Sequence, residues 1–302
     1  MSAALVHDWL TGMRGGEKVL ECLCDLLPDA DIFTLIYVRG SVSAPIERHR
    51  ITTSFIQRLP MAERGYRRYL PLFPRAIQQL DLAGHDFVVS SSHCVAKAAV
   101  APAGVRHLCY CHSPMRYAWD QFDAYFGPAK VGHLASRFVY RPLLGRLARW
   151  DAATASRVDR FVANSQYVAG RIRRYYNRTA TVVYPPVDTA FYHPAAVTTN
   201  HRFLIVSALV PYKRIDLAIA ACERVGAVLR IAGDGPERTR LERAAGSRVE
   251  FLGRLADEQL RDEYRRAAAV LMPGEEDFGI VPVEAQACGT PVVALARGVR
   301  SR

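Results

Sequence analysis

Residues 203–245 read FLIVSALVPYKRIDLAIAACERVGAVLRIAGDGPERTRLERAA, and two kinds of hydrophobic spacing alternate along them. Residues 203–207 and 228–232 are mainly apolar runs of strand length, whereas residues 215–225 and 236–245 carry apolar side chains at helical spacing. Repeated strand–helix units build parallel sheets with helices on both faces. These residues therefore predict an α/β domain.

The same alternation continues on both sides of this stretch. Further strands are predicted at residues 3–7, 32–38, 87–91, 107–111, 161–163, 181–184, 249–252, 270–272 and 291–294. Further helices are predicted near residues 19–27, 133–156, 258–267 and 281–288. Pro142 should break or kink the longest of these helices, because it lacks an amide hydrogen.

A proline-rich segment at residues 184–188, followed by small and polar residues as far as Asn200, separates two series of strands and helices. We therefore expect two Rossmann-like domains, residues 1–198 and 199–302, that face each other across a cleft. In such folds ligands bind at the carboxyl ends of the strands.

Composition limits the class of protein. The 302 residues include 40 basic and 29 acidic side chains, which gives a formal net charge of +11, and half of the residues are apolar. This balance is typical of a globular protein and excludes disorder for most of the chain. No apolar run reaches the ~20 residues that span a bilayer, and no secretory signal is visible. The seven scattered cysteines are interpreted as reduced thiols of a cytoplasmic protein.

Two stretches combine arginines with aromatic and aliphatic residues. Residues 58–75 carry five arginines against one glutamate, and residues 137–150 carry four arginines and no acid. This mixture is typical of a segment that lies on an anionic membrane surface. For either stretch alone, the favoured interpretation is a solvated helix face whose apolar side packs on the domain. No nucleic-acid-binding motif is present, so nucleic acid is not an expected partner.

Residues 276–284 carry the most specific chemistry. Glu276 precedes a glycine-containing turn that opens a helix, and the free amides of a helix N-terminus attract phosphate and hydroxyl groups. Gly279 allows a close backbone approach, and Pro282 is suited to a first helical turn. Glu284 could accept hydrogen bonds from neighbouring hydroxyls, such as those of a ribose.

The surrounding sequence, PGEEDFGIVPVEAQACGTPVVA at residues 273–294, resembles the signature of retaining glycosyltransferases of family 4. This family has the GT-B fold of two Rossmann-like domains and carries an E-x7-E motif. Segments SALVPYKRID (207–216), GDGP (233–236) and FLG (251–253) agree in order and spacing. VHDWLTGMRGGEKVLE near the N-terminus and CHSPMRYAWD at 111–120 resemble the mannosyltransferase subgroup of O-antigen and surface-polysaccharide synthesis.

The resemblance implies three catalytic residues. Glu276 would hold the transferred hexose, Lys213 would supply charge to the donor diphosphate, and His112 would line the donor-sugar pocket. The other donor-binding positions that it implies are Gly15 and Gly16 at the diphosphate, Arg214 beside Lys213, Asp234, Gly235 and Arg254 near the base, Phe278, Gly279, Ile280 and Val281 at the hexose, and Glu284 at the ribose.

The resemblance also implies the reaction and its partners. A hexosyl group, with GDP-mannose as the expected donor, would pass with retention to a lipid-linked or polysaccharide acceptor. The protein would be cytoplasmic and peripherally attached to the inner face of the plasma membrane. The family needs no divalent metal, and no Asp-x-Asp motif occurs here, so no cofactor is expected.

Two departures from the family pattern qualify this expectation. Ala208 stands where many members have an arginine, so that Arg214 or another residue would have to replace it. The second series has about a hundred residues, whereas a complete domain of this type has ~150. We therefore expect a truncated C-terminal domain and weak turnover. The alternative function is a degenerate protein that binds a nucleotide-sugar without transfer.

Overall fold

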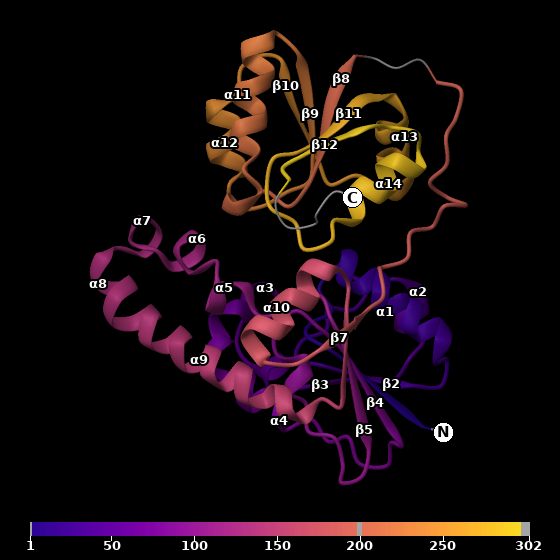
Figure 1. Ribbon diagram of the computed structural model, residues 1–302, viewed down its shortest axis with the longest axis vertical. Helices are drawn as coiled ribbons and strands as arrows, with labels where there is room; N and C mark the ends of the chain where they lie inside the picture. The colour runs from indigo at the N-terminus through magenta and orange to yellow at the C-terminus, as the bar shows by residue number, and fades with distance from the viewer. Residues whose placement is uncertain (1, 198–200, 297–302) are drawn as a thin grey trace. The chain divides into compact units, whose positions relative to one another are not determined.

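A computed structural model describes residues 2–197 and 201–296 (Figure 1). The chain forms two compact units, Met1–Pro186 and Val187–Arg302. The expected domain boundary after residue 198 falls outside the described residues. The division lies earlier because Tyr192 is only 3% exposed and packs with the core of the second unit.

The first unit is built on a parallel sheet with strand order β3-β2-β1-β4-β5-β6-β7. Its strands are β1 (Ala3–His7), β2 (Asp31–Thr34), β3 (Ile51–Thr53), β4 (Phe87–Ser92), β5 (Arg106–Cys111), β6 (Arg160–Ala163) and β7 (Ala180–Val182). Its helices are α1 (Gly15–Leu26), α2 (Ala44–Glu47), α3 (Ala62–Gly65), α4 (Phe73–Gln78), α5 (Arg116–Trp119), α6 (Phe122–Phe126), α7 (Pro128–Val131), α8 (His133–Ala135), α9 (Arg141–Thr154) and α10 (Gln166–Tyr176).

Helices cover both faces of this sheet. Alternate residues of β1 point to opposite faces, so Leu5 packs with α1 and α2, whereas Val6 packs in the core that contains α4 and α9. Figure 1 shows α1 and α2 on one side of the strands and α4 and α9 on the other. Burial on both faces explains why the central strands are continuous apolar runs.

Three local expectations need correction. The strand expected at 32–38 ends at Thr34, because residues 36–38 pair with the backbone of Leu10 instead. Strand β3 was missing from the expected set. The helix expected at 133–156 is divided: a π-turn at Ser136–Tyr140 separates α8 from α9, and Pro142 lies in the first turn of α9.

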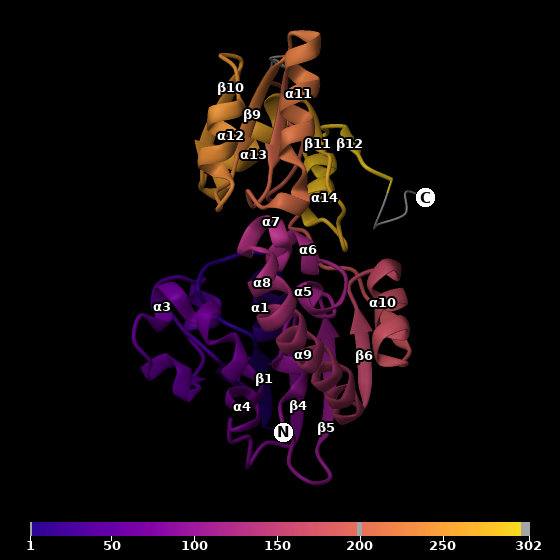
Figure 2. The same cartoon turned by 90° about the vertical axis from the view of Figure 1, so that its left-hand side faces the viewer.

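The second unit has a five-stranded parallel sheet with order β10-β9-β8-β11-β12. Its strands are β8 (Arg202–Val206), β9 (Val228–Ala232), β10 (Val249–Gly253), β11 (Ala267–Met272) and β12 (Val292–Ala294). Its helices are α11 (Ile215–Val225), α12 (Arg238–Ala244), α13 (Asp257–Arg266) and α14 (Ile280–Ala287). Helices α11 and α12 cover one face, and α13 and α14 cover the other (Figures 1 and 2).

The predicted fold class is confirmed: both units are parallel α/β sheets between layers of helices. Among the described residues, none of the helices combines the length and the apolar character that crossing a bilayer requires.

Candidate functional site

Polar side chains of the second unit gather at the edge where β8, β9 and β11 end. The segments after these strands carry Lys213, Asp234 and Glu276. Parallel strands place their carboxyl ends at one edge, which is where such sheets bind ligands. A small hollow lies at this edge, and its lining includes Ser207, Lys213, Gly274 and Glu276.

Lys213 and Glu276 form an ion pair in this hollow. Lys213 Nζ donates a hydrogen bond to Glu276 Oε1, and the two side chains are 14% and 22% exposed. Their partial burial strengthens the attraction relative to a surface pair. The hollow therefore holds a cation and a carboxylate that both remain accessible to a ligand.

Gly274 sets the distance between the two segments that carry this pair. A Cβ atom at position 274 would lie 2.6 Å from the Cα of Lys213 and 2.7 Å from the carbonyl oxygen of Tyr212. Any side chain there would force the segment after β11 away from the segment after β8. The glycine thus keeps Glu276 within reach of Lys213.

Gly233 and Gly235 have the same effect on the segment after β9. A Cβ atom at 233 would overlap the carbonyl oxygen of Ser207, and one at 235 would lie 2.5 Å from that of Leu209. Leu209 N also donates to the carbonyl oxygen of Asp234 at 3.0 Å. The two glycines therefore let the segments after β8 and β9 pack backbone against backbone.

Helix α14 begins directly after the Glu276 segment. Gly279 is its N-cap, with a φ of +75°, and Pro282 lies in its first turn. The first amides of a helix have no acceptor within the helix, and the positive end of the helix dipole lies there. Phe278 to Val281, predicted to bind the hexose, form this turn and helix start.

Glu284 is a buried carboxylate on the same helix. It is 3% exposed, and its Oε2 accepts a hydrogen bond from Tyr264 Oη at 2.9 Å. Burial and the neighbouring Glu284 charge raise the pKa of Tyr264 well above its ordinary value, so the tyrosine remains a donor. Ribose binding by Glu284 stays a prediction, and Tyr264 is a partner that the sequence analysis missed.

The other predicted residues of this unit lie nearer the surface. Arg214 is half-exposed and contacts Asp216 at 3.2 Å. Asp234 Oδ1 accepts from the amide of Gly235 at 2.8 Å. Arg254 is exposed immediately after β10. The role of Arg214 at the diphosphate, and the roles of Asp234, Gly235 and Arg254 near a nucleotide base, stay predictions.

In the first unit, Gly15 and Gly16 begin α1, as predicted, and His112 follows β5. A Cβ atom on Gly16 would lie 3.7 Å from His112 Nε2 and 3.7 Å from His7 Cε1. The start of α1 and the ends of β1 and β5 therefore meet at one place. Lys213 and Glu276 belong to the second unit, and the expected cleft between the units stays a prediction.

Ser91 links His112 to a second imidazole. Ser91 Oγ lies 2.8 Å from His112 Nε2 and 3.1 Å from His7 Nδ1. His7 Nε2 lies 3.8 Å from Glu17 Oε1, on α1. The chain Glu17–His7–Ser91–His112 therefore ties α1, β1, β4 and β5 together and fixes the orientation of the His112 ring.

Burial favours the neutral form of two imidazoles in this cluster, those of His93 and His112. Burial, with smaller effects of His93 and His7, lowers the pKa of His112 well below its ordinary value. Burial likewise lowers the pKa of His93, against the opposing charge of Asp8. Burial alone would raise the pKa of Glu17, but the hydrogen bond and charge of His7 lower it overall. A neutral His112 is suited to a hydroxyl group rather than to a phosphate.

Asp8 holds the loop that follows β4. It is fully buried, and its carboxylate accepts from four consecutive amides, those of residues 93–96, at 2.6–2.9 Å. His93 Nδ1 lies 3.3 Å from Asp8 Oδ2. The sequence analysis missed Asp8, His7 and His93, although polar residues directly after apolar strands were a usable signal.

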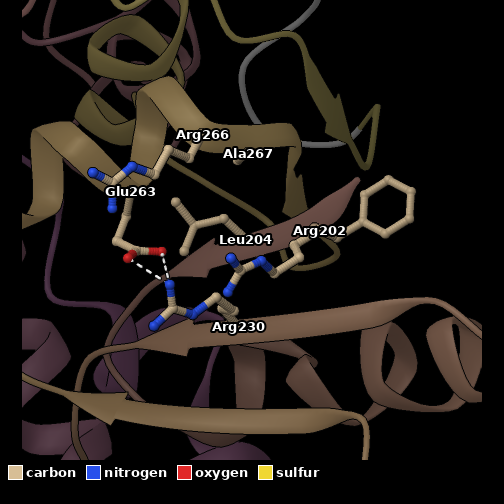
Figure 3. Close-up of a pocket in the computed structure, with 7 residues that line it drawn as sticks. Arg202, Leu204, Arg230, Glu263, Arg266 and Ala267 are labelled. Atoms are coloured by element: carbon tan, nitrogen blue, oxygen red, sulfur yellow. Dashed lines mark hydrogen bonds and ion pairs between the residues drawn. The ribbon is translucent and has the colours of Figure 1, made fainter. Parts of the chain in front are cut away.

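A second hollow lies at the opposite edge of the second sheet. It is lined by Arg202 and Ala267, the first residues of β8 and β11, and by Arg230 and Glu263 (Figure 3). Arg230 Nη1 donates to both oxygens of Glu263 at 2.6 and 2.8 Å, and its Nε lies 3.0 Å from Glu250. The carboxylates of Glu263 and Glu250 thus balance the positive charge of Arg230. The lining of this hollow includes none of the predicted site residues.

Within residues 2–197 and 201–296, no cluster of three or more His, Cys, Asp or Glu side chains is arranged to hold a metal ion. The candidate residues of the second unit are a cation–carboxylate pair and a helix start, and those of the first unit are a cluster of buried imidazoles.

Two family profiles match the chain. Residues 13–191 match Glycosyltransferase Family 4, and residues 189–301 match Glycosyl transferases group 1. The chain belongs to glycosyltransferase family 4. This confirms the family that the resemblance implied, while the mannosyltransferase subgroup stays a prediction.

Curated relatives match this chain over only part of their own length. The D-inositol 3-phosphate glycosyltransferase of Mycolicibacterium smegmatis is 32% identical over 165 residues, which cover 46% of this chain and 38% of that protein. The chain thus aligns with well under half the length of this curated relative.

Solved structures confirm the GT-B fold. Anabaena Alr3699/HepE in complex with UDP has a TM-score of 0.68 at 18% identity, and the match covers 99% of this chain and 81% of that one. Sucrose-phosphate synthase from Thermosynechococcus elongatus has a TM-score of 0.66 at 19% identity, with 99% and 82% covered. At such identities the likeness establishes the fold alone.

Proposed function

We propose that this chain is a retaining glycosyltransferase that uses a nucleotide-sugar donor, and that its second unit holds the donor. The observation that carries the proposal is the Lys213–Glu276 pair beside the start of α14, at the carboxyl edge of a parallel sheet. Membership of family 4 supports it. So does HepE, a protein of the same fold whose structure contains UDP.

The side chains have complementary tasks in this proposal. Lys213 binds the donor diphosphate, and Glu276 accepts hydrogen bonds from hydroxyls of the hexose. On donor binding the two side chains exchange their mutual contact for contacts with the donor. In the first unit, the neutral imidazole of His112 is suited to a further sugar hydroxyl.

The proposed reaction depends on stabilising the negative charge that develops on the leaving group. As the bond between the anomeric carbon and the phosphate oxygen breaks, negative charge grows on the departing nucleoside diphosphate. Lys213 and the amides at the start of α14 stabilise this charge more in the transition state than in the ground state. In the proposed front-face route, the acceptor oxygen bonds to the anomeric carbon on the face from which the phosphate departs and gives its proton to the leaving phosphate oxygen. Glu276 then orients the donor.

The donor and acceptor are further proposals. GDP-mannose and a lipid-linked saccharide at the inner face of the plasma membrane agree with the resemblance of residues 111–120 to surface-polysaccharide mannosyltransferases. UDP-glucose is the competing donor, because the HepE structure was also obtained with it. Binding of each donor to the purified chain, measured by calorimetry, distinguishes the two.

Substitutions at the central pair test the function. We expect Lys213→Ala to weaken donor binding at least ~10-fold, since a charge-assisted contact is lost. Glu276→Gln should lower kcat/KM for transfer by ~100-fold or more. Arg224→Ala is the matched control, because it removes an equal charge from the exposed far end of α11.

Three results would count against the proposal. Donor binding that survives Lys213→Ala would exclude the diphosphate contact. Donor binding without transfer to any lipid-linked or soluble saccharide would make the chain a nucleotide-sugar-binding protein. An inverted product configuration would contradict the retaining reaction.

A further inference from the structure

The sequence analysis left two basic stretches as alternatives for membrane contact, and the structure separates them. We propose that the segment from Pro128 to Arg149, here called the basic arm, binds the surface of an anionic phospholipid bilayer. The basic arm comprises α7, α8, the π-turn and most of α9. Its proposed binding depends on exposure and charge, so it holds whether or not the chain transfers a sugar.

Three large apolar side chains in the first half of the basic arm face solvent. Leu134 is 76% exposed, Phe138 66% and Val139 56%. Leu134 and Phe138 are separated by one helical turn and therefore lie on the same side. Large apolar side chains grouped at an exposed site indicate contact with an apolar partner, whereas scattered ones need no explanation.

Residues 58–75 differ in this respect. Tyr66 is 6% exposed and Phe73 1%, and both belong to the main core of the first unit. Tyr69 and Leu70 pack against the same core. The apolar side chains of this stretch therefore stabilise the fold, and its arginines form a solvated surface.

Basic side chains predominate around the exposed apolar group, and the carboxylate of Asp123 lies 3.7 Å from Arg141. Residues 124–150 contain no aspartate or glutamate, and they include Lys130, Arg137, Arg141, Arg146 and Arg149, all exposed. Arginine and lysine side chains near an apolar group can reach lipid phosphates while their stems contact the acyl region. A protein-binding surface usually carries a rim of mixed charge, so a bilayer of anionic lipid is the occupant that this surface fits.

The basic arm is anchored at its far end. Asp151, which follows it, is fully buried and accepts from Trp119 Nε1 at 2.8 Å and from Tyr176 Oη at 2.9 Å. Lys97 Nζ lies 3.1 Å from Asp151 Oδ1. Leu144 and Leu147 on the inner side of α9 are also buried. Membrane contact through residues 134–141 would therefore orient the whole first unit and not only a loose segment.

Vesicle binding of the purified full chain tests the proposal. The probes are phosphatidylcholine vesicles with and without phosphatidylglycerol, used in a flotation assay at low and high salt. We expect binding only to the vesicles that contain phosphatidylglycerol, and weaker binding at high salt. Replacing Phe138 by Trp should give a blue shift of its fluorescence when these vesicles are added.

Matched pairs of variants assign the binding to the basic arm. Arg137→Gln with Arg146→Gln should lower the partition coefficient by ~10-fold or more, whereas Arg67→Gln with Arg68→Gln in the other stretch should leave it nearly unchanged. Arg137→Lys with Arg146→Lys should retain binding, because the charge is kept. Leu134→Ser with Phe138→Ser should abolish binding, and Met61→Ser with Leu72→Ser should not.

All of these positions are exposed, so circular dichroism should be unchanged in each variant. Equal losses in the two arginine pairs, or equal binding to neutral and anionic vesicles, would overturn the proposal. So would a lack of vesicle binding together with a dimer that Phe138→Ser dissociates, because the occupant would then be a second copy of the chain.

Discussion

At the scale of single residues, the first unit contains several buried or half-buried histidine side chains whose pKa values are lowered. His107 on β5 is 1% exposed, and its Nε2 lies 2.7 Å from Ser90 Oγ on β4. Burial lowers the pKa of His107 from 6.5 to about 4. His93 and His112 also have lowered pKa values, again mainly because of burial. The folded first unit thus takes up protons less readily than the unfolded chain.

Stability of the first unit should therefore fall in weak acid. Below pH 6.5 the unfolded chain binds protons that folded His107 does not bind, so the stability present above 6.5 is lost as the pH falls toward 4. We expect the free energy of unfolding to be about 2 kcal/mol lower near pH 5 than near pH 7.5 from His107 alone. Urea unfolding measures this difference.

His107→Gln should remove this part of the pH dependence, and His133→Gln, at an exposed position, should leave it in place. A pH dependence that is the same in both variants would show that His107 titrates normally in the folded protein.

At the scale of elements, the tight contacts of the second unit depend on glycine. A Cβ atom at position 235 would meet the carbonyl oxygen of Leu209, whereas one at position 145 on α9 would have no neighbouring atom within 4 Å. Alanine at the two positions should therefore have opposite effects, since one glycine permits a contact and the other only lowers helix propensity.

We expect Gly235→Ala to destabilise the second unit by about 2 kcal/mol or more through the forced separation of two segments, and to weaken donor binding as well. Gly145→Ala should stabilise the first unit by up to about 1 kcal/mol. Thermal unfolding followed by circular dichroism checks both. A neutral effect of Gly235→Ala would mean that the segments after β8 and β9 separate easily.

Elements with strong periodicity could be predicted from the sequence, and short ones could not. The central strands β1, β4 and β5 and the helix α11 were found because buried strands and amphipathic helices have distinct apolar spacing. Strand β3 has only three half-buried residues, too few for a pattern.

The residues of the candidate site also differ in whether the sequence alone could predict them. Glu276 and Lys213 could be found because a recognisable motif surrounds each, and the structure brings them together. Tyr264 could not be found, because its partner Glu284 lies 20 residues away in the sequence and only the tertiary fold makes them neighbours. Asp8 was missed although it directly follows an apolar strand, which was a usable signal.

At the scale of the whole molecule, two units with separate cores make up the chain. Residues before the expected boundary belong to the second core: Tyr192 packs with Tyr264, with ring centroids 5.9 Å apart. All three tryptophans, at positions 9, 119 and 150, lie in the first unit. Tryptophan fluorescence therefore reports on the first unit, and circular dichroism reports on both.

Tyr192→Ala should lower the stability of the second unit by about 3 kcal/mol, the usual cost of removing a buried aromatic ring. In urea, the transition seen by circular dichroism should move to lower concentration while the tryptophan transition stays in place. A shift of both transitions by the same amount would indicate that the two units unfold as one.

The glycines at 233, 235 and 274 also bear on how this protein can diverge. Backbone contacts fix the spacing of the three segments. Replacing any of these glycines adds a Cβ atom where another chain segment lies, so mutation cannot easily change this spacing. A change of sugar preference would have to arise through substitutions of side chains that line the hollow, such as Ser207, while the backbone beneath them keeps its position. Descendants of this sequence should therefore vary at the rim and keep these three positions empty of side chains.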